Sequence, residues 1–201
     1  MPTVFNEDGY RGMVHPNDHE PVHVHICKNG ISIKIDVETF EVIGVVGGLP
    51  KLKEVKKAIK LTKKHKQAIE KNGESYMSES VDTSITLEDI ERIRARSQQL
   101  EAVEHRAMAV RYDAGQKRLH IETLREDAFS VNVDLLQGVA GADDRQIANI
   151  EILPGGEGLY WPDLDASLLV HGICTGVYGS RRWMARKIRK TGLHSEISAV
   201  S

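Results

Sequence analysis

The clearest pattern in the chain is an alternation of apolar and polar residues on both sides of Asn29-Gly30. Apolar residues occupy every second position from Val22 to Ile26 and again from Ile31 to Val37. Alternation with a period of two predicts β-strands, and Asn-Gly between two such runs predicts a two-residue hairpin turn. The turn also sets the register of the two strands, because a shift by one residue would exchange their faces.

This register predicts a hairpin with one apolar and one polar face. The predicted polar pairs are His23 with Asp36, His25 with Lys34, and Cys27 with Ser32. We expect the apolar face to contact the core and the polar face to be exposed and to carry the chemistry.

A third strand over 40–46 and a lysine-rich helix are expected to follow the hairpin. The helix has an apolar stripe, formed by Leu52, Val55, Ala58, Ile59, Thr62 and Ile69, and should end at Asn72-Gly73. The N-terminal part is therefore predicted as a βββα domain over residues 1–77.

The second half of the chain returns to strand patterns after a helical connector over 78–105. Thr86 is the expected N-cap of the connector helix, which we expect to belong mainly to neither core. Strands are expected over 107–113, 118–124 and 129–135, followed by a short helix at 143–146 and an extended segment over 150–153. The predicted fold class is α+β, with an N-terminal antiparallel sheet plus a basic helix and a C-terminal β-meander domain over 106–178.

Length and composition agree with two small domains. The chain has 201 residues, of which 28% are charged and 40% hydrophobic, with a formal net charge of -2. Its two cysteines, Cys27 and Cys174, form no metal-binding or disulfide pattern. No signal-like start and no apolar run long enough to cross a membrane is present, so a cytoplasmic protein without membrane contact is expected.

The near-neutral charge hides two basic segments. The helix over 51–71 and a tail over 179–201 are rich in lysine and arginine, and the tail adds a tryptophan. Such segments favour local contact with a polyanion, and tryptophan can stack on a base. The alternative is a solvated helix face. The candidate nucleic-acid-binding residues are Lys56, Lys60, Lys63, Lys64, Arg181, Arg182, Trp183 and Arg186.

The main candidate site is a group of histidines around the hairpin: His15, Asp18, His19, His23 and His25. We expect metal-free acid–base chemistry, in which Asp36 orients and charges His23 while His25 and Lys34 face a phosphate, an arrangement that suits RNA cleavage. These four residues are the predicted catalytic set, and no cofactor is expected. A metal site of His19, His23 and His25 is less favoured, because Lys34 would place a cation beside it. Structural or partner-facing histidines remain the third alternative.

Three further groups are interpreted as structural. Cys27 lies too far along its strand from His23 to serve as its nucleophile partner and is expected to be inert. Gly155-Gly156-Glu157-Gly158 lacks the Lys-Ser/Thr of a phosphate-binding loop and is predicted to be a turn. Asp163 and Asp165 are expected to belong to a rigid corner around a buried Trp161.

Two stretches resemble known families. Residues 1–77 resemble domain-of-unknown-function family 4160, through Met1-Pro2-Thr3, Gly9-Tyr10-Arg11, Glu20-Pro21, His23-Val24-His25 and a lysine-rich helix with His65. Residues 106–176 are similar to domain-of-unknown-function family 2442, through Asp134-Leu135-Leu136, Ala142 with Arg145, and the decapeptide 156–165. The resemblance implies small bacterial proteins, encoded as neighbours or fusions, that look like toxin–antitoxin partners.

The sequence therefore predicts a fused toxin–antitoxin-like protein. Its N-terminal domain would bind RNA or cleave it as a ribonuclease, and contact with the C-terminal domain would restrain it. A non-enzymatic regulator that binds DNA or RNA, and a protein-interaction scaffold, are the alternatives. A homo-oligomer stays open.

Overall fold

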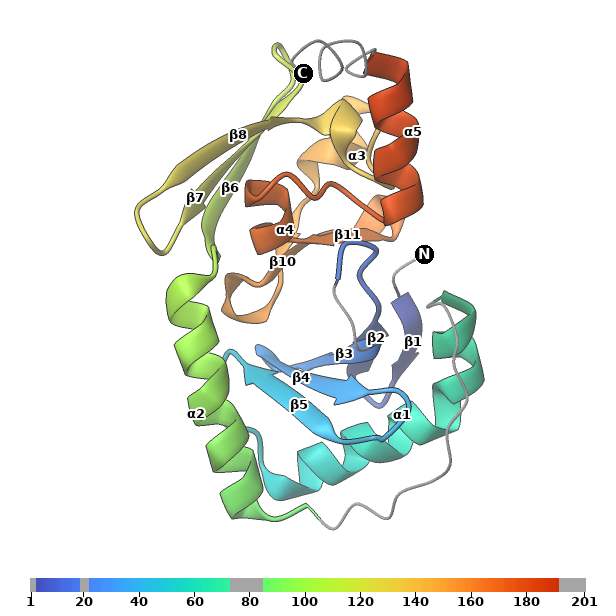
Figure 1. The fold of residues 1–201 in the computed structure, drawn as a ribbon, viewed down its shortest axis with the longest axis vertical. Helices are drawn as coiled ribbons and strands as arrows, with labels where there is room; N and C mark the ends of the chain where they lie inside the picture. The colour runs from blue at the N-terminus through green and yellow to red at the C-terminus, as the bar shows by residue number, and fades with distance from the viewer. Residues whose placement is uncertain (1–2, 19–21, 73–84, 192–201) are drawn as a thin grey trace, which may run out of the picture.

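The N-terminal part is a five-stranded antiparallel sheet with a long helix on one face. The computed structural model describes residues 3–18, 22–72 and 85–191. The strands are adjacent in chain order: β1 (Thr3–Glu7), β2 (Tyr10–Met13), β3 (His23–Lys28), β4 (Ile31–Asp36) and β5 (Val42–Val46). Helix α1 (Leu52–Asn72) runs beneath this sheet in Figure 1.

The predicted hairpin register is confirmed. His23 pairs with Asp36 and His25 with Lys34, and the pairing continues to the turn. Asn29 and Gly30 have φ angles of 49° and 76°, as the mirror-image turn of a two-residue hairpin requires. Apolar pairs such as Ile26 with Ile33 face α1 and form the core of this part.

The N-terminal sheet has two more strands than the predicted βββα domain. Strands β1 and β2 are joined by Asp8-Gly9, whose φ angles of 53° and 74° form a second hairpin turn. Asp-Gly is a recognised hairpin signal. The strands beside it are only five and four residues long, so their alternation is a weak signal. The expected third strand begins later than predicted, because Phe40 has a φ of 59° in the preceding turn.

Helix α1 buries the predicted stripe. Val55, Ala58, Ile59, Thr62 and Ile69 are buried, while most of the lysines between them are exposed. The helix ends at Asn72, as expected.

Helix α2 (Leu87–Val103) packs on the N-terminal sheet, which corrects the expectation that it would belong mainly to neither core. Thr86 caps it as predicted, since its hydroxyl accepts a hydrogen bond from the Asp89 N–H. Ile90 is fully buried in the N-terminal core. The helix also provides hydrogen-bond partners for the backbone of the edge strand β5. The Val45 N–H donates to Ser97 Oγ, and Arg94 donates to the Val45 carbonyl. Because an open strand edge leaves polar backbone groups unpaired, the edge holds this helix in place.

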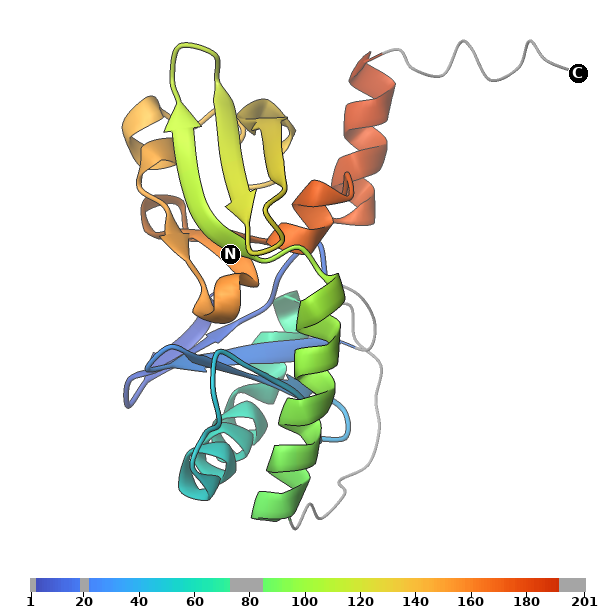
Figure 2. The same ribbon diagram turned by 90° about the vertical axis from the view of Figure 1, so that its left-hand side faces the viewer.

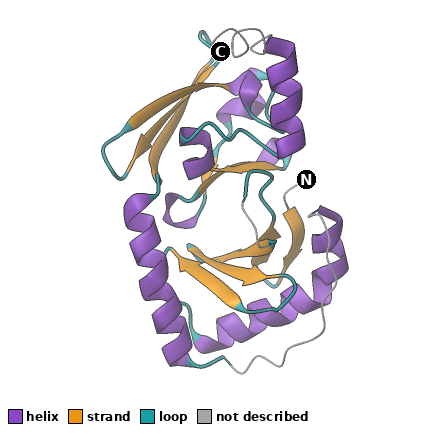
Figure 3. Cartoon of the chain, viewed as in Figure 1, coloured by secondary structure: helices purple, strands orange, loops and turns teal. Residues whose placement is uncertain are grey.

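The C-terminal part contains the predicted meander and a second small sheet. Strands β6 (Ala107–Asp113), β7 (Arg118–Thr123) and β8 (Ala128–Asn132) form the meander. Strands β9 (Glu151–Ile152), β10 (Gly158–Trp161) and β11 (Ala166–Leu169) form the other sheet. Short helices α3 (Asp144–Ala148) and α4 (Val170–Cys174) and the basic helix α5 (Arg181–Thr191) complete it (Figure 3).

The rigid corner predicted around Trp161 is present. The Trp161 side chain is fully buried, and its indole N–H donates to the Ile147 carbonyl over 3.0 Å. Asp163 accepts a hydrogen bond from Asn149, and Asp165 accepts one from the Tyr160 hydroxyl. Both acids therefore stabilise the corner.

The two parts are stacked, with the sheet β9–β11 and its loops lying over the face of the N-terminal sheet that α1 leaves open (Figures 1 and 2). A glycine makes one of these contacts close. Gly155 has a φ of +63°, and a Cβ atom there would lie 2.4 Å from Val46 Cγ1 and 3.2 Å from the Gly47 nitrogen. Within the described residues, none of the helices is long and apolar enough to cross a bilayer.

We expect Gly155→Ala to destabilise the protein more than Gly141→Ala. Gly141 also has a positive φ, of +84°, but a Cβ there would meet nothing within 4 Å. The Gly141 variant therefore measures the backbone cost alone, about 1–2 kcal/mol. The Gly155 variant should lose roughly 1–3 kcal/mol more, because it overpacks the contact between the two parts. Urea unfolding of both variants measures this, and equal losses would show that the contact is not tight.

Candidate functional site

The polar face of the hairpin is covered by the C-terminal part, contrary to the expectation of an exposed face. His23 is 2% exposed and His25 is 0% exposed. The covering residues belong to the loop before β10 and to the position directly before β6, more than 80 positions from His23 and His25. The expected chemistry-bearing face is therefore the contact between the two parts.

Glu157 is the central residue on the C-terminal side. It lies at the end of the Gly155-Gly156 turn, directly before β10. Its Oε1 is 3.2 Å from His25 Nδ1, and its Oε2 is 3.3 Å from Lys34 Nζ. Arg106 Nη1 lies 3.6 Å from the same Oε2. The predicted turn is present, but it also places a buried carboxylate against the two groups expected to face a phosphate.

Asp18 is the acid that contacts both histidines of the hairpin. Its Oδ2 lies 2.9 Å from His23 Nε2 and 2.8 Å from His25 Nε2. Asp36 was the expected partner of His23, but its Oδ1 accepts the backbone N–H groups of Glu38 and Thr39, at 2.8 Å each. Asp36 therefore stabilises the β4–β5 turn, and this part of the predicted site is corrected: cross-strand pairing places two residues opposite each other without joining their side chains.

The loop between β2 and β3 is anchored in the C-terminal part. His15 is 3% exposed, and its Nδ1 lies 2.7 Å from Ser167 Oγ on β11. Asn17 donates to the carbonyls of Leu169 and Val177 and accepts the Leu169 N–H. These contacts hold Asp18 in position. His19 lies outside the described residues.

The charged groups in the site stabilise one another's charged forms. Burial would lower the pKa of His25, but the Glu157 charge and the Asp18 hydrogen bond raise it above its ordinary value. Burial would raise the pKa of Asp18, yet its hydrogen bonds to His23 and His25 hold that pKa well below the ordinary value. The pKa of Glu157 is lowered in the same way by His25, despite its burial. The site therefore favours a positive charge on His25 between two carboxylates.

A small apolar cluster lies beside the polar contacts. Met13 and Cys27 from the N-terminal sheet pack against Leu153 and Tyr160. Arg11 lies over the Tyr160 ring at 4.5 Å and contacts Glu151 at 3.3 Å. Burial raises the pKa of the Cys27 thiol to about 12, which agrees with the expectation that this cysteine is inert.

The predicted nucleic-acid-binding residues lie on two separate helices. Lys56, Lys60, Lys63 and Lys64 are exposed on α1, where Lys64 contacts Glu7 at 2.7 Å. Arg181, Arg182 and Arg186 are exposed on α5. Figure 1 places α1 in the lower half of the molecule and α5 in the upper half, so the two do not form one surface. The last residues of the predicted tail, 192–201, lie outside the described residues.

Trp183 is part of the fold as well as of the basic helix. It is half-buried, and its indole N–H donates to the Leu135 carbonyl over 2.7 Å. Arg186 and Lys187 lie over its ring, at 5.7 Å and 4.8 Å. This contact joins α5 to the C-terminal part.

Comparisons with known proteins confirm both predicted resemblances. Residues 9–72 match the model of a domain of unknown function, DUF4160, and residues 107–179 match that of a protein of unknown function, DUF2442. A protein of unknown function from Rhodospirillum rubrum is 37% identical over 40% of this chain and 98% of its own, with a TM-score of 0.39. An uncharacterized protein from Chromobacterium violaceum is 24% identical over 53% of this chain and 96% of its own, with a TM-score of 0.42. None of the curated proteins matches the chain.

Three residues of the site were not identified from sequence: Glu157, Arg106 and Ser167. The only signal for Glu157 is its place in the 156–165 decapeptide, directly after a glycine pair. Arg106 lies directly before β6 and Ser167 lies within β11, and neither carries a sequence signal.

We expect His15→Asn to flatten the dependence of stability on pH. Burial first, and then the neighbouring His25, lower the pKa of His15 from 6.5 to about 3. Between pH 7 and pH 5 the unfolded chain therefore takes up a proton here while the folded chain does not, so the free energy of unfolding falls as the pH falls. The loss from this residue is about 2 kcal/mol at pH 5.

The measurement is urea unfolding at pH 7 and pH 5 in the presence of EDTA. Ser167→Ala is the matched control, since it removes the hydrogen-bond partner and keeps the titrating ring. It should destabilise the protein at both pH values without flattening the slope. A His15→Asn slope equal to that of the unchanged protein would contradict the prediction.

Proposed function

We propose that this chain is a self-restrained, RNA-directed protein of the toxin–antitoxin kind, working in the cytoplasm. The N-terminal domain carries the RNA-directed face, and the C-terminal domain covers it. One observation carries the proposal: Glu157 contacts both His25 and Lys34, the two groups suited to face a phosphate. A carboxylate in this position occupies the place of a substrate anion.

The uncovered face has the groups that RNA cleavage needs. One imidazole takes the proton of the ribose 2′-hydroxyl as its oxygen attacks phosphorus. A second imidazole gives a proton to the departing 5′-oxygen, and a cyclic phosphate forms. His23 and His25 supply two imidazoles with ring centroids 4.9 Å apart, and Lys34 supplies a cation. Asp18 takes the orienting role first expected for Asp36.

The kinds of side chain in the contact between the two parts support the proposal that the two parts can separate. Polar and charged side chains contact one another across it, beside the small apolar cluster of Met13, Cys27, Leu153 and Tyr160. Contacts of this kind resemble transient interfaces more than a continuous core. The closed arrangement is therefore suited to a restrained state.

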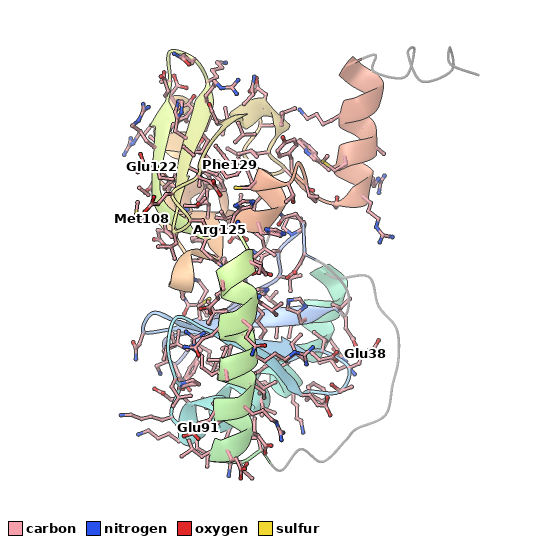
Figure 4. All side chains as sticks on the ribbon, turned by 60° about the vertical axis from the view of Figure 1, so that its left-hand side comes forward. Glu38, Glu91, Met108, Glu122, Arg125 and Phe129 are labelled. Carbon is pink, nitrogen blue, oxygen red and sulfur yellow. The ribbon has the colours of Figure 1, made fainter. Side chains whose placement is uncertain are left out.

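We expect Glu157→Gln to increase RNA cleavage by the full-length protein at least tenfold. The change keeps the shape of the side chain but removes the charge that holds His25 and Lys34. Cleavage of a fluorescent single-stranded RNA measures the effect, and Glu157→Gln combined with His25→Ala should return to background. Glu122→Gln is the control, because Glu122 is exposed on the meander (Figure 4). An inactive Glu157 variant that is folded would contradict a restrained nuclease.

A second candidate function is nucleic-acid binding without cleavage, favoured by helix α5. Its residues include no acid, and the side chains of Arg181, Arg182 and Arg186 are exposed. Phosphate contacts by such side chains release counterions, which makes the affinity depend on salt.

We expect Arg182→Gln with Arg186→Gln to weaken RNA binding and to reduce its salt dependence. Each lost phosphate contact should lower the slope of log affinity against log salt by about 0.7 for single strands. Lys56→Gln with Lys60→Gln on α1 is the matched control, and its effect should be smaller because acidic Glu54 and Glu70 lie on the same helix. Fluorescence anisotropy at several salt concentrations tests both. Unchanged slopes in the α5 variant would exclude this helix.

A further inference from the structure

Two imidazole nitrogens and one carboxylate oxygen converge inside the contact between the two parts. Asp18 Oδ2 lies 2.9 Å from His23 Nε2 and 2.8 Å from His25 Nε2. The three ligand atoms all lie within 4.8 Å of one another. The histidines alternate with Val24 along β3, so the strand itself places both rings on one face.

His25 faces a carboxylate at each of its ring nitrogens. Asp18 lies at Nε2 and Glu157 at Nδ1, and the ring is 0% exposed. A neutral imidazole has a single N–H, so one contact would set a nitrogen lone pair against a carboxylate oxygen. Both sides are satisfied by a second proton on the ring, or by a metal cation bound at Nε2 with the proton at Nδ1.

The net charge around the site can accommodate one additional positive charge. Among the described residues in contact there, the carboxylates of Asp18, Glu157 and Glu104 stand against Lys34 and Arg106. Negative charge exceeds positive charge by one when the histidines are neutral. Lys34 does not oppose a metal ion as first expected, because its ammonium group pairs with Glu157, on the Nδ1 side of His25.

Glu157 has the position of an outer partner of a metal ligand. A histidine that binds a metal through one nitrogen almost always donates the other N–H to a carboxylate, a carbonyl or water. Here His25 Nδ1 lies 3.2 Å from Glu157 Oε1. The carboxylate comes from the other domain, so it would fix the ring only when the two parts are in contact.

We propose that Asp18, His23 and His25 bind a divalent first-row transition-metal ion, with Glu157 orienting His25 from the C-terminal domain. Two imidazoles and one carboxylate suit zinc and its neighbours better than magnesium or calcium, which prefer oxygen ligands. Donor atoms 2.0–2.2 Å from a tetrahedral ion lie about 3.3–3.5 Å apart. The observed contacts of 2.8 and 2.9 Å reach that spacing by small side-chain rotations.

The ion would also change what the face can do. A metal-bound imidazole cannot take up or give a proton at the bound nitrogen. Metal binding would therefore hold His25 in the orientation that Glu157 requires and keep the face closed. This regulatory consequence rests on the proposed function, whereas the metal site does not.

The test uses the full-length protein, freed of metal with EDTA and then titrated with ZnCl₂ in a calorimeter and with CoCl₂ in a spectrophotometer. We expect one equivalent to bind with a dissociation constant of micromolar or below, and Co²⁺ to show visible absorption. Asp18→Asn and His23→Gln should each weaken binding at least a hundredfold. Glu157→Gln should weaken it tenfold to a hundredfold and leave the stoichiometry at one, as expected for an outer partner.

His65→Ala is the matched control. His65 also contacts a carboxylate, with its Nε2 3.0 Å from Glu7 Oε2, but it belongs to the other side of the N-terminal sheet and contacts Phe5. Its removal should leave the affinity unchanged. Cooperative urea unfolding in EDTA confirms that each variant is folded, and if one substitution at the site unfolds the protein, the other decides. Absence of binding, or binding that Asp18→Asn and His23→Gln leave unchanged, would overturn the site. Metal binding in a protein whose Glu157→Gln variant cleaves no RNA would support the site and contradict only the nuclease.

Discussion

The position of His25 between two carboxylates is the contact on which the arrangement of the two parts of the chain depends. Asp18 belongs to the N-terminal part and Glu157 to the C-terminal part, and both contact an imidazole ring that is 0% exposed. Removing either acid would leave a buried charge or a buried lone pair without a partner. The loss of stability would then exceed the net contribution of an ordinary hydrogen bond. The contact therefore specifies one relative placement of the two parts.

Several features of the fold serve this contact. Gly155 allows the loop before Glu157 to approach the N-terminal sheet closely, and Gly156 allows it to approach the Ala107 backbone of β6. Asn17 holds the loop that carries Asp18. Helix α2 joins the two parts but packs with the N-terminal one, because its side chains hydrogen-bond to the backbone of the edge strand β5. The result is a buried polar contact with defined partners. Such a contact fixes the positions of its side chains, as a functional site requires, more than it adds to stability.

The hairpin shows how far local patterning reaches. Asn29-Gly30 and the alternation on both sides were enough to predict every cross-strand pair, since turn type and pleat leave one register. The same reasoning missed β1 and β2, because these strands are too short to show a clear alternation of apolar and polar residues. The Asp8-Gly9 dipeptide between them was nevertheless a signal for their turn. It also predicted Asp36 as the partner of His23. Strand register fixes which backbone positions are opposite each other, but the Asp36 carboxylate accepts backbone N–H groups and His23 contacts Asp18 instead.

The amino-acid sequence by itself determined the fold class, the hairpin, the basic helix after β5, the corner around Trp161 and the resemblance of each part to its family. These depend on interactions between residues close along the chain, or on periodicity that such residues share. Only the tertiary structure decided that the histidine face is buried and that Glu157, Arg106 and Ser167 complete it. Those residues are at least 70 positions from strands β3 and β4, and local sequence preferences do not determine which distant carboxylate contacts a given imidazole.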